Sequence, residues 1–184
     1  MRYFILLPLV LNIAWVQAQN LVPNGGFEEY TECPTSISQV DRAVGWSMVS
    51  GSPDYFNRCN VNDSMGVPLN IIGYQEPFEG DAYMGVSVYS GGCGYRECFQ
   101  HALAEPLTPG VPVYLSMRVS PGGFGNDPDP NRYNSARYAS NGIGMKFSTQ
   151  AHTFNTLWPG NVALQMTSIL NDTASWTEVS GIYV

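Results

Sequence analysis

The segment LVPNGGFEEY (residues 21–30) places two carboxylates directly after a tight turn. Its proline fixes its own φ angle and Gly25 and Gly26 tolerate positive φ angles, so the sequence predicts a turn after which Phe27 returns to the core. Calcium binds six to eight oxygens and accepts backbone carbonyls together with carboxylates. Glu28 is therefore a candidate ligand of a structural calcium ion, and the alternative is a surface turn with two solvated acids.

Aromatic side chains offer a second kind of chemistry, because flat rings stack on the faces of neutral sugars. Trp158 stands in a turn just before a proline, where burial is difficult, so it is the first candidate for glycan binding. Tyr55 and Tyr74 are expected in loops and are the next candidates. Trp46 and Trp176 lie within strand-like patterns and are expected in the core.

Catalytic patterns are weak in this chain. The two histidines, His101 and His152, are accompanied by neither a G-x-S-x-G motif nor a Cys–His arrangement. The acids of YQEPFEGDAY (residues 74–83) are expected in a turn between strands, where solvated charge is the ordinary explanation. The sequence therefore predicts a protein that is not an enzyme.

The first residues indicate export. Arg2 precedes an apolar run from Phe4 to Val16, which is too short for a comfortable membrane span. Small residues at the recognition positions favour cleavage after Ala18, and no later segment is apolar enough to cross a bilayer. We expect residues 1–18 to be a signal peptide, and the mature chain to reach the cell surface, the medium or the periplasm.

Four cysteines in an exported chain predict disulfides, because the compartment is oxidising and the spacings match no zinc site. Four cysteines allow three pairings. Cys93 and Cys98 bracket the short segment CGYREC, so the favoured pairing joins them to each other and joins Cys33 to Cys59. Each bridge is expected to stabilise the fold by about 2–4 kcal/mol.

Composition indicates one β-rich domain over residues 19–184. About 165 residues suffice for a single sizeable core. The low charged fraction of 12%, with 19 glycines and 13 prolines, suits many short strands joined by tight turns. The formal net charge of -7 disfavours nucleic acids and acidic membrane surfaces as partners, whereas neutral ligands or cations fit better.

Apolar residues at alternate positions predict strands. In VPVYLSMRV (residues 111–119), Val113, Leu115, Met117 and Val119 alternate with more polar residues, the period of a half-buried strand. Five further segments are strand-like: residues 82–89, 98–107, 143–147, 162–169 and 176–184. About eight strands with turns between them predict an antiparallel β-sandwich.

The last strand-like segment carries two further expectations. Gly181 suggests a β-bulge. Val184 falls inside the strand pattern, so we expect the sequence to be a fragment that lacks at least one further strand, which would otherwise cover an exposed sheet edge.

The segment NLVPNGGFEEY resembles the opening of galactose-binding-like jelly rolls, including several carbohydrate-binding module families. Their first strand carries an N-G-x-F-E motif whose Glu often ligates a structural calcium, and Asn24, Gly25, Phe27 and Glu28 match it. Further ligands in those families come partly from an Asp beyond a W-x-x-V-S-G motif. This chain has that motif from Trp176 and stops before such an Asp, so the implied calcium site is incomplete.

A second resemblance covers nearly the whole mature chain. NLVPNGGFEEYTECPTSISQVDRAVGW, GSPDYFNRC, VPLNIIGYQEPFEGDAYMGV, YRECFQHALAEPLTPGVPVYLSMRVS and NGIGMKFS, in that order, resemble the N-terminal domain of exported surface proteins of gliding Gram-negative bacteria. In those proteins the domain often precedes an outer-membrane-protein-A-like peptidoglycan-binding domain or a secretion-sorting domain. Cys98 stands where the family tends to have an aromatic residue, so its bridge to Cys93 would be a local addition.

Three functions follow as expectations. The first is an exported, non-catalytic jelly-roll module that binds glycan or mediates cell-surface contact, stiffened by two disulfides and a calcium ion. The second is a structural spacer that presents a missing C-terminal anchor or sorting domain. The third is an accessory module of a secreted hydrolase, because such jelly rolls often accompany catalytic domains.

Overall fold

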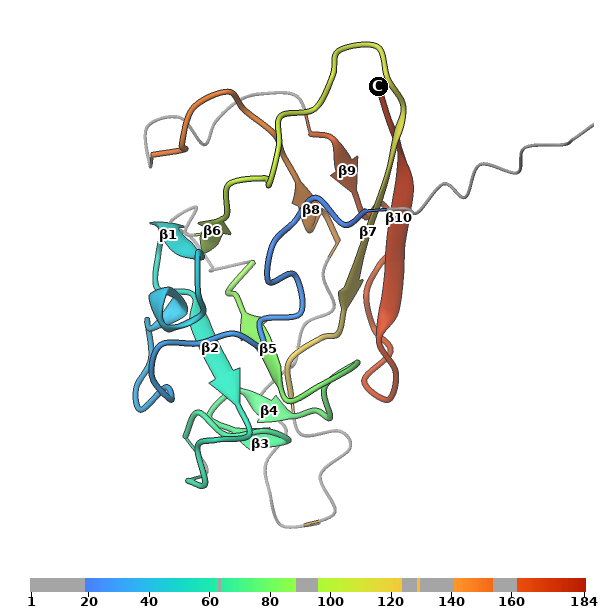
Figure 1. Cartoon of the computed structure of the whole chain (residues 1–184). Helices are drawn as coiled ribbons and strands as arrows, with labels where there is room; N and C mark the ends of the chain where they lie inside the picture. The colour runs from blue at the N-terminus through green and yellow to red at the C-terminus, as the bar shows by residue number, and fades with distance from the viewer. Residues whose placement is uncertain (1–18, 63, 89–95, 124–128, 130–140, 154–161) are drawn as a thin grey trace, which may run out of the picture.

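The computed structural model describes residues 19–62, 64–88, 96–123, 129, 141–153 and 162–184 (Figure 1). The expected signal peptide, residues 1–18, lies outside this part of the chain. Within it the structure is almost entirely β, and all named strands pair antiparallel, which confirms the predicted all-β class. The elements are η1 (Val40–Arg42), β1 (Ser47–Ser50), β2 (Asp54–Asn57), β3 (Leu69–Asn70), β4 (Gly73–Tyr74), β5 (Ala82–Gly85), β6 (Cys98–Gln100), β7 (Val113–Val119), β8 (Gly144–Met145), β9 (Leu164–Gln165) and β10 (Thr177–Tyr183).

The strands form two-stranded sheets: β1–β6, β2–β5, β3–β4, β8–β9 and β7–β10. In the described residues these pairs do not join into two continuous layers, so the sandwich and the jelly roll stay predictions. The long β7–β10 pair lies at one side of the molecule in Figure 1, and β1, β2 and β6 lie at the other. No helix in the described ranges is long and apolar enough to cross a membrane.

The β7–β10 pair confirms the alternation read from the sequence. Val113, Leu115 and Met117 are half-buried and Val119 is buried, while the residues between them are exposed. The predicted bulge at Gly181 is wrong, because the register runs without a shift from Thr177 to Tyr183. A Cβ at Gly181 would lie 3.2 Å from Leu164 Cδ1, a tight contact that a small shift of the Leu164 side chain would have to relieve.

In the part of the chain that the structure describes, three apolar clusters form the core. The first lies at the β7–β10 pair and β9 and contains Val119, Leu164, Met166, Leu170 and Val179. The second contains Phe56, Met65, Val67 and Tyr83, with Trp176 packed against it. The third contains Ala43, Tyr55 and Ala82, with Phe27, Trp46 and Met84 packed against it. Trp46 and Trp176 therefore pack against the core, as predicted.

A close backbone approach links β4 to the segment after β7. Tyr74 N–H donates to the Gly123 carbonyl over 2.9 Å, and Gly73 and Gly123 form a parallel bridge. A Cβ at Gly73 would lie 2.4 Å from the Gly123 oxygen, so no larger residue fits at this position. The contact joins the region of the second cluster to that of the first.

Candidate functional site

The PNGG turn forms, but the residues with positive φ angles are not the two glycines at which the sequence predicted them. Positive φ angles occur at Asn24 (48°) and Phe27 (64°), and not at Gly25 or Gly26. The Asn24 side chain accounts for this, because its Nδ2 donates to the Glu29 carbonyl over 2.8 Å and its Oδ1 accepts from Glu29 N–H over 2.9 Å. Asparagine tolerates the left-handed region, and these bonds fix it there.

Glu28 holds a second turn in place. Both of its carboxylate oxygens accept from Asp81 N–H, each over 3.0 Å. The neighbouring Gly80 has a φ of 65°, and a Cβ there would lie 2.2 Å from Glu28 Oε1. Gly80 is therefore favoured by its backbone angle, and a side chain at this position would in addition displace the Glu28 carboxylate.

This arrangement does not fit the expected calcium site. The Asp81 amide hydrogen occupies the position between the two Glu28 oxygens, where a cation held by both of them would lie. Within the described ranges, no group of three or more acidic, histidine or cysteine side chains could hold a metal ion. Calcium binding at Glu28 stays a prediction of the sequence.

A surface hollow of about 330 Å³ lies beside this turn and is lined by Glu28, Tyr30, Asn57, Arg58, Cys59 and Asp81. Arg58 donates to Glu76 Oε2 and to Asp81 Oδ1, each over 2.9 Å. The hydrogen bond to Glu76 is the main reason that the Arg58 pKa lies above its ordinary value. The positive charge of Arg58 is thus already paired with two carboxylates, so among the described residues this hollow offers no unpaired guanidinium to a ligand.

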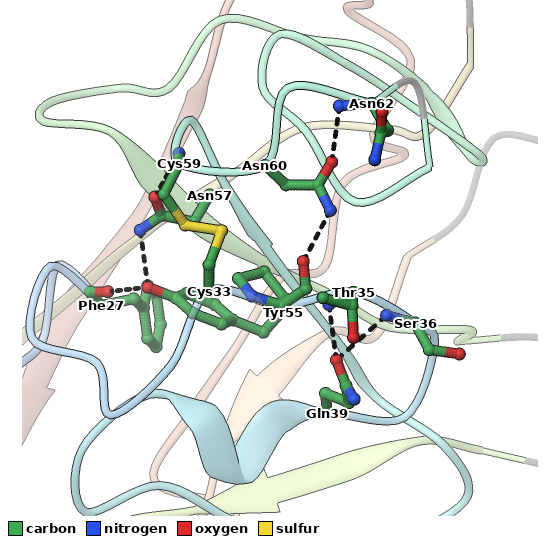
Figure 2. Close-up of a disulfide and its surroundings, with 11 residues drawn as sticks. Phe27, Cys33, Thr35, Ser36, Gln39, Tyr55, Asn57, Cys59, Asn60 and Asn62 are labelled. Atoms are coloured by element: carbon green, nitrogen blue, oxygen red, sulfur yellow. Dashed lines mark hydrogen bonds between the residues drawn. A yellow bond between two sulfur atoms is a disulfide. The ribbon is translucent and has the colours of Figure 1, made fainter.

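Tyr55 was expected in a loop as a sugar-binding ring, and this is wrong. It lies in β2 and is 0% exposed. Its hydroxyl donates to the Phe27 carbonyl over 2.8 Å and accepts from Asn57 Nδ2 over 2.7 Å (Figure 2). Burial raises the Tyr55 pKa to about 12. The ring has no free face for a sugar, and it ties β2 to the turn after Asn24.

The predicted Cys33–Cys59 disulfide is confirmed, with a Cα–Cα distance of 5.9 Å (Figure 2). Side-chain amides hold the chain on both sides of it. Asn57 Oδ1 accepts from Cys59 N–H over 2.8 Å, and Asn60 Nδ2 donates to the Pro34 carbonyl over 2.6 Å. Figure 2 shows these bonds, Tyr55 and the disulfide grouped at one place.

The second predicted bridge, Cys93–Cys98, is not seen. Cys98 carries a free thiol, and Cys93 lies outside the described residues. Cys98 is half-buried in β6, where it pairs with Ser50 of β1. Burial is the main reason that its thiol pKa is raised, and the charge of Glu97 adds to the effect.

The two other aromatic candidates have different outcomes. Tyr74 lies in β4 and not in a loop, and it is partly exposed. Trp158 lies outside the described residues, so its place as the first glycan-binding candidate stays a prediction. The structure thus brings none of the described aromatic candidates together into a platform.

A groove that the sequence did not indicate lies between the first and second apolar clusters. Its volume is about 230 Å³. Val119 and Leu170 of the first cluster line one part of it, and Tyr83 and Trp176 line another. Its lining residues come from segments between Asn70 and Trp176, so no local pattern in the sequence could have revealed it.

Hydrogen bonds order the polar groups of this groove. Asn70, which is 2% exposed, donates through Nδ2 to the Tyr83 hydroxyl over 2.7 Å. Ser120 Oγ donates to Gln75 Oε1 over 2.9 Å. Trp176 Nε1 donates to the Glu76 carbonyl over 2.8 Å, which fixes the indole ring against Tyr83 at a centroid distance of 5.6 Å.

Arg118 also lines the groove, and its charge is compensated. Its Nη2 lies 2.5 Å from Glu178 Oε2, and its guanidinium carbon lies 4.5 Å from the centre of the Phe78 ring. The Glu178 pKa is lowered, chiefly by the hydrogen bond from the Tyr114 hydroxyl, with Arg118 contributing less.

No family model matches this chain, and neither a curated protein nor a solved structure shows significant similarity to it. The resemblances to galactose-binding-like jelly rolls and to bacterial surface proteins therefore stay predictions. The function of the chain has to be inferred from the chemistry of the groove and of the turn at Glu28.

Proposed function

We propose that the chain is an exported, non-catalytic binding module of the jelly-roll type, and that the groove holds part of a neutral glycan at the cell surface. The observation that carries this proposal is the combination of two fixed aromatic rings, Tyr83 and Trp176, with the polar groups of Asn70 and Gln75 around one concave site. Ligand sites typically combine an apolar lining with a few placed polar groups in this way.

The charges of the molecule support a neutral ligand. The net charge of -7 repels anions at long range. The one guanidinium found among the lining residues of the groove, that of Arg118, already pairs with Glu178. A carboxylated or sulfated sugar would have to displace this ion pair, whereas a neutral sugar would not.

A glycan array probed with the chain lacking residues 1–18 tests the proposal. We expect binding to neutral glycans, and we expect Gln75→Leu to weaken it because the groove loses an amide. Gln165→Leu is the matched control, since Gln165 is exposed on β9 and does not line the groove. Thermal melts confirm that each variant is folded.

Two results would count against this assignment. A blank array with folded protein would favour the structural spacer. Binding that is lost in Trp158→Ala but kept in Gln75→Leu would move the glycan site from the groove to the segment around Trp158.

A further inference from the structure

The groove has an apolar interior. Val119 is 6% exposed and Leu170 is 7% exposed, and Ile143 and Met84 also line the groove. A sugar hydroxyl placed against these side chains would lose its hydrogen bonds to water without gaining others, which is unfavourable. A methyl group placed there would be stabilised by its removal from water. The interior therefore favours a sugar that carries an apolar substituent.

The hydroxyl of Tyr83, which lines the groove, accepts a hydrogen bond but donates none among the described residues. Tyr83 is 8% exposed, and its oxygen accepts from Asn70 Nδ2. Among the described residues, no acceptor takes the Tyr83 hydroxyl proton, although a buried donor is normally satisfied. Asn70 does not serve, because its donor atom Nδ2 faces the Tyr83 hydroxyl, while its Oδ1 faces Ile72 N–H over 3.1 Å. A ligand oxygen in the groove would satisfy this donor.

Size narrows the choice further. The volume of about 230 Å³ lies below the range of roughly 300–1,000 Å³ that is common for pockets that hold drug-sized ligands. The groove thus suits one sugar unit with a small substituent, and the remaining units of a chain would lie outside it, near Gln75 and Ser120 at the polar part of the lining.

We propose that the groove recognises the acetamido group of a neutral N-acetylated amino sugar. The acetamido carbonyl accepts the Tyr83 hydroxyl proton, and its methyl group packs on the apolar interior formed by Val119, Leu170 and Ile143. This assignment rests on the proposed function, and it adds the chemical feature that the site selects.

Calorimetry with two matched trisaccharides tests it. Chitotriose with N-acetyl groups and cellotriose share the same linkage and differ in the acetamido group in place of a hydroxyl. We expect the acetylated sugar to bind the chain lacking residues 1–18 about tenfold more tightly, a difference of about 1.4 kcal/mol. Tyr83→Phe should remove most of this preference, because it removes the donor and keeps the ring.

A second variant protects the test against a folding defect in Tyr83→Phe. Gly122 lines the groove, and a Cβ there would lie 3.5 Å from the Ile72 carbonyl oxygen, an ordinary contact. Gly122→Val should therefore fold, narrow the groove and weaken binding of the acetylated sugar at least tenfold. Gly26→Val is the matched control away from the groove, where the nearest atoms to a Cβ lie 3.7 Å away.

The failures are distinguishable. Any of three results overturns the acetamido assignment and leaves a glycan-binding module: equal affinities for the two sugars, a preference that survives Tyr83→Phe, or unchanged affinity of Gly122→Val for the acetylated sugar. Binding of neither sugar overturns the acetamido assignment, and a blank glycan array in addition overturns the proposed function itself.

Discussion

Two regions of this molecule are held together in different ways. Around Cys33–Cys59 the strands have two to four residues, and the structure depends on a disulfide and on side chains that bond to the backbone, such as Tyr55 and Asn57. The β7–β10 region uses seven-residue strands in unbroken register over an apolar cluster. The first region is stabilised by specific polar contacts, and the second by periodic burial.

The largest expected effect comes from removing the disulfide. Replacing both Cys33 and Cys59 with Ala removes a cross-link between residues that are 26 positions apart, so the unfolded chain gains conformational entropy. The free energy of unfolding should fall by about 3–4 kcal/mol. Urea denaturation measures this. Cys98→Ala is the control, because Cys98 is a free thiol, and it should cost less than about 1 kcal/mol. A double variant as stable as the control would show that the polar contacts alone hold this region.

In the second region, the matching change is Leu164→Ala. Leu164 is 9% exposed and lies in the first apolar cluster, so its truncation should cost about 3 kcal/mol. Ile182→Ala removes a similar volume from a side chain that is 63% exposed, and it should cost less than about 0.5 kcal/mol. Similar losses for the two variants would mean that Ile182 is packed as tightly as the first apolar cluster on the other face of the β7–β10 pair, against the alternation described above.

A smaller effect is expected from Tyr55→Phe. This change keeps the buried ring, but it leaves the Phe27 carbonyl without its donor and Asn57 Nδ2 without its acceptor. The expected loss is about 2 kcal/mol in the free energy of unfolding. Tyr114→Phe is the control, because Tyr114 is 63% exposed and water can replace its bond to Glu178. Equal losses would contradict a special role for the buried hydroxyl.

The smallest effect concerns pH. Burial raises the Asp54 pKa, Ser38 N–H partly opposes this, and the charge of Glu97 adds to it. The folded state therefore holds the proton more tightly than the unfolded state, so the contribution of Asp54 to stability falls as pH rises from about 3.9 through the raised value. Asp54→Asn keeps an oxygen for Ser38 and should be more stable than the wild type at pH 7.

This advantage of Asp54→Asn should shrink as the pH is lowered through the Asp54 pKa, and melting curves over a pH series can follow it. A constant difference between the two proteins at all pH values would show that the Asp54 carboxyl is not perturbed by folding.

The same contrast explains what could be predicted from sequence. Alternation at Val113–Val119 is a local pattern, so the strand, its inward residues and the all-β class were predictable. Asp54–Asn57 spans four residues and has no such period, so Tyr55 was expected in a loop. The Cys33–Cys59 pairing was found by loop length, whereas the groove depends on Tyr83 and Trp176 meeting across 93 positions, which no short segment encodes.

Residues 24–28 have a consequence for the order in which the chain folds. Their acceptors are filled by distant donors: the Asn24 carbonyl by Trp46 Nε1, the Phe27 carbonyl by the Tyr55 hydroxyl, and the Glu28 carboxylate by Asp81 N–H. Because synthesis runs from the N-terminus, the residues that carry these acceptors are made before the residues that carry the donors. Residues 24–28 thus cannot reach their final state until residue 81 has emerged, and a nascent chain stalled before that point should keep this segment open to proteases.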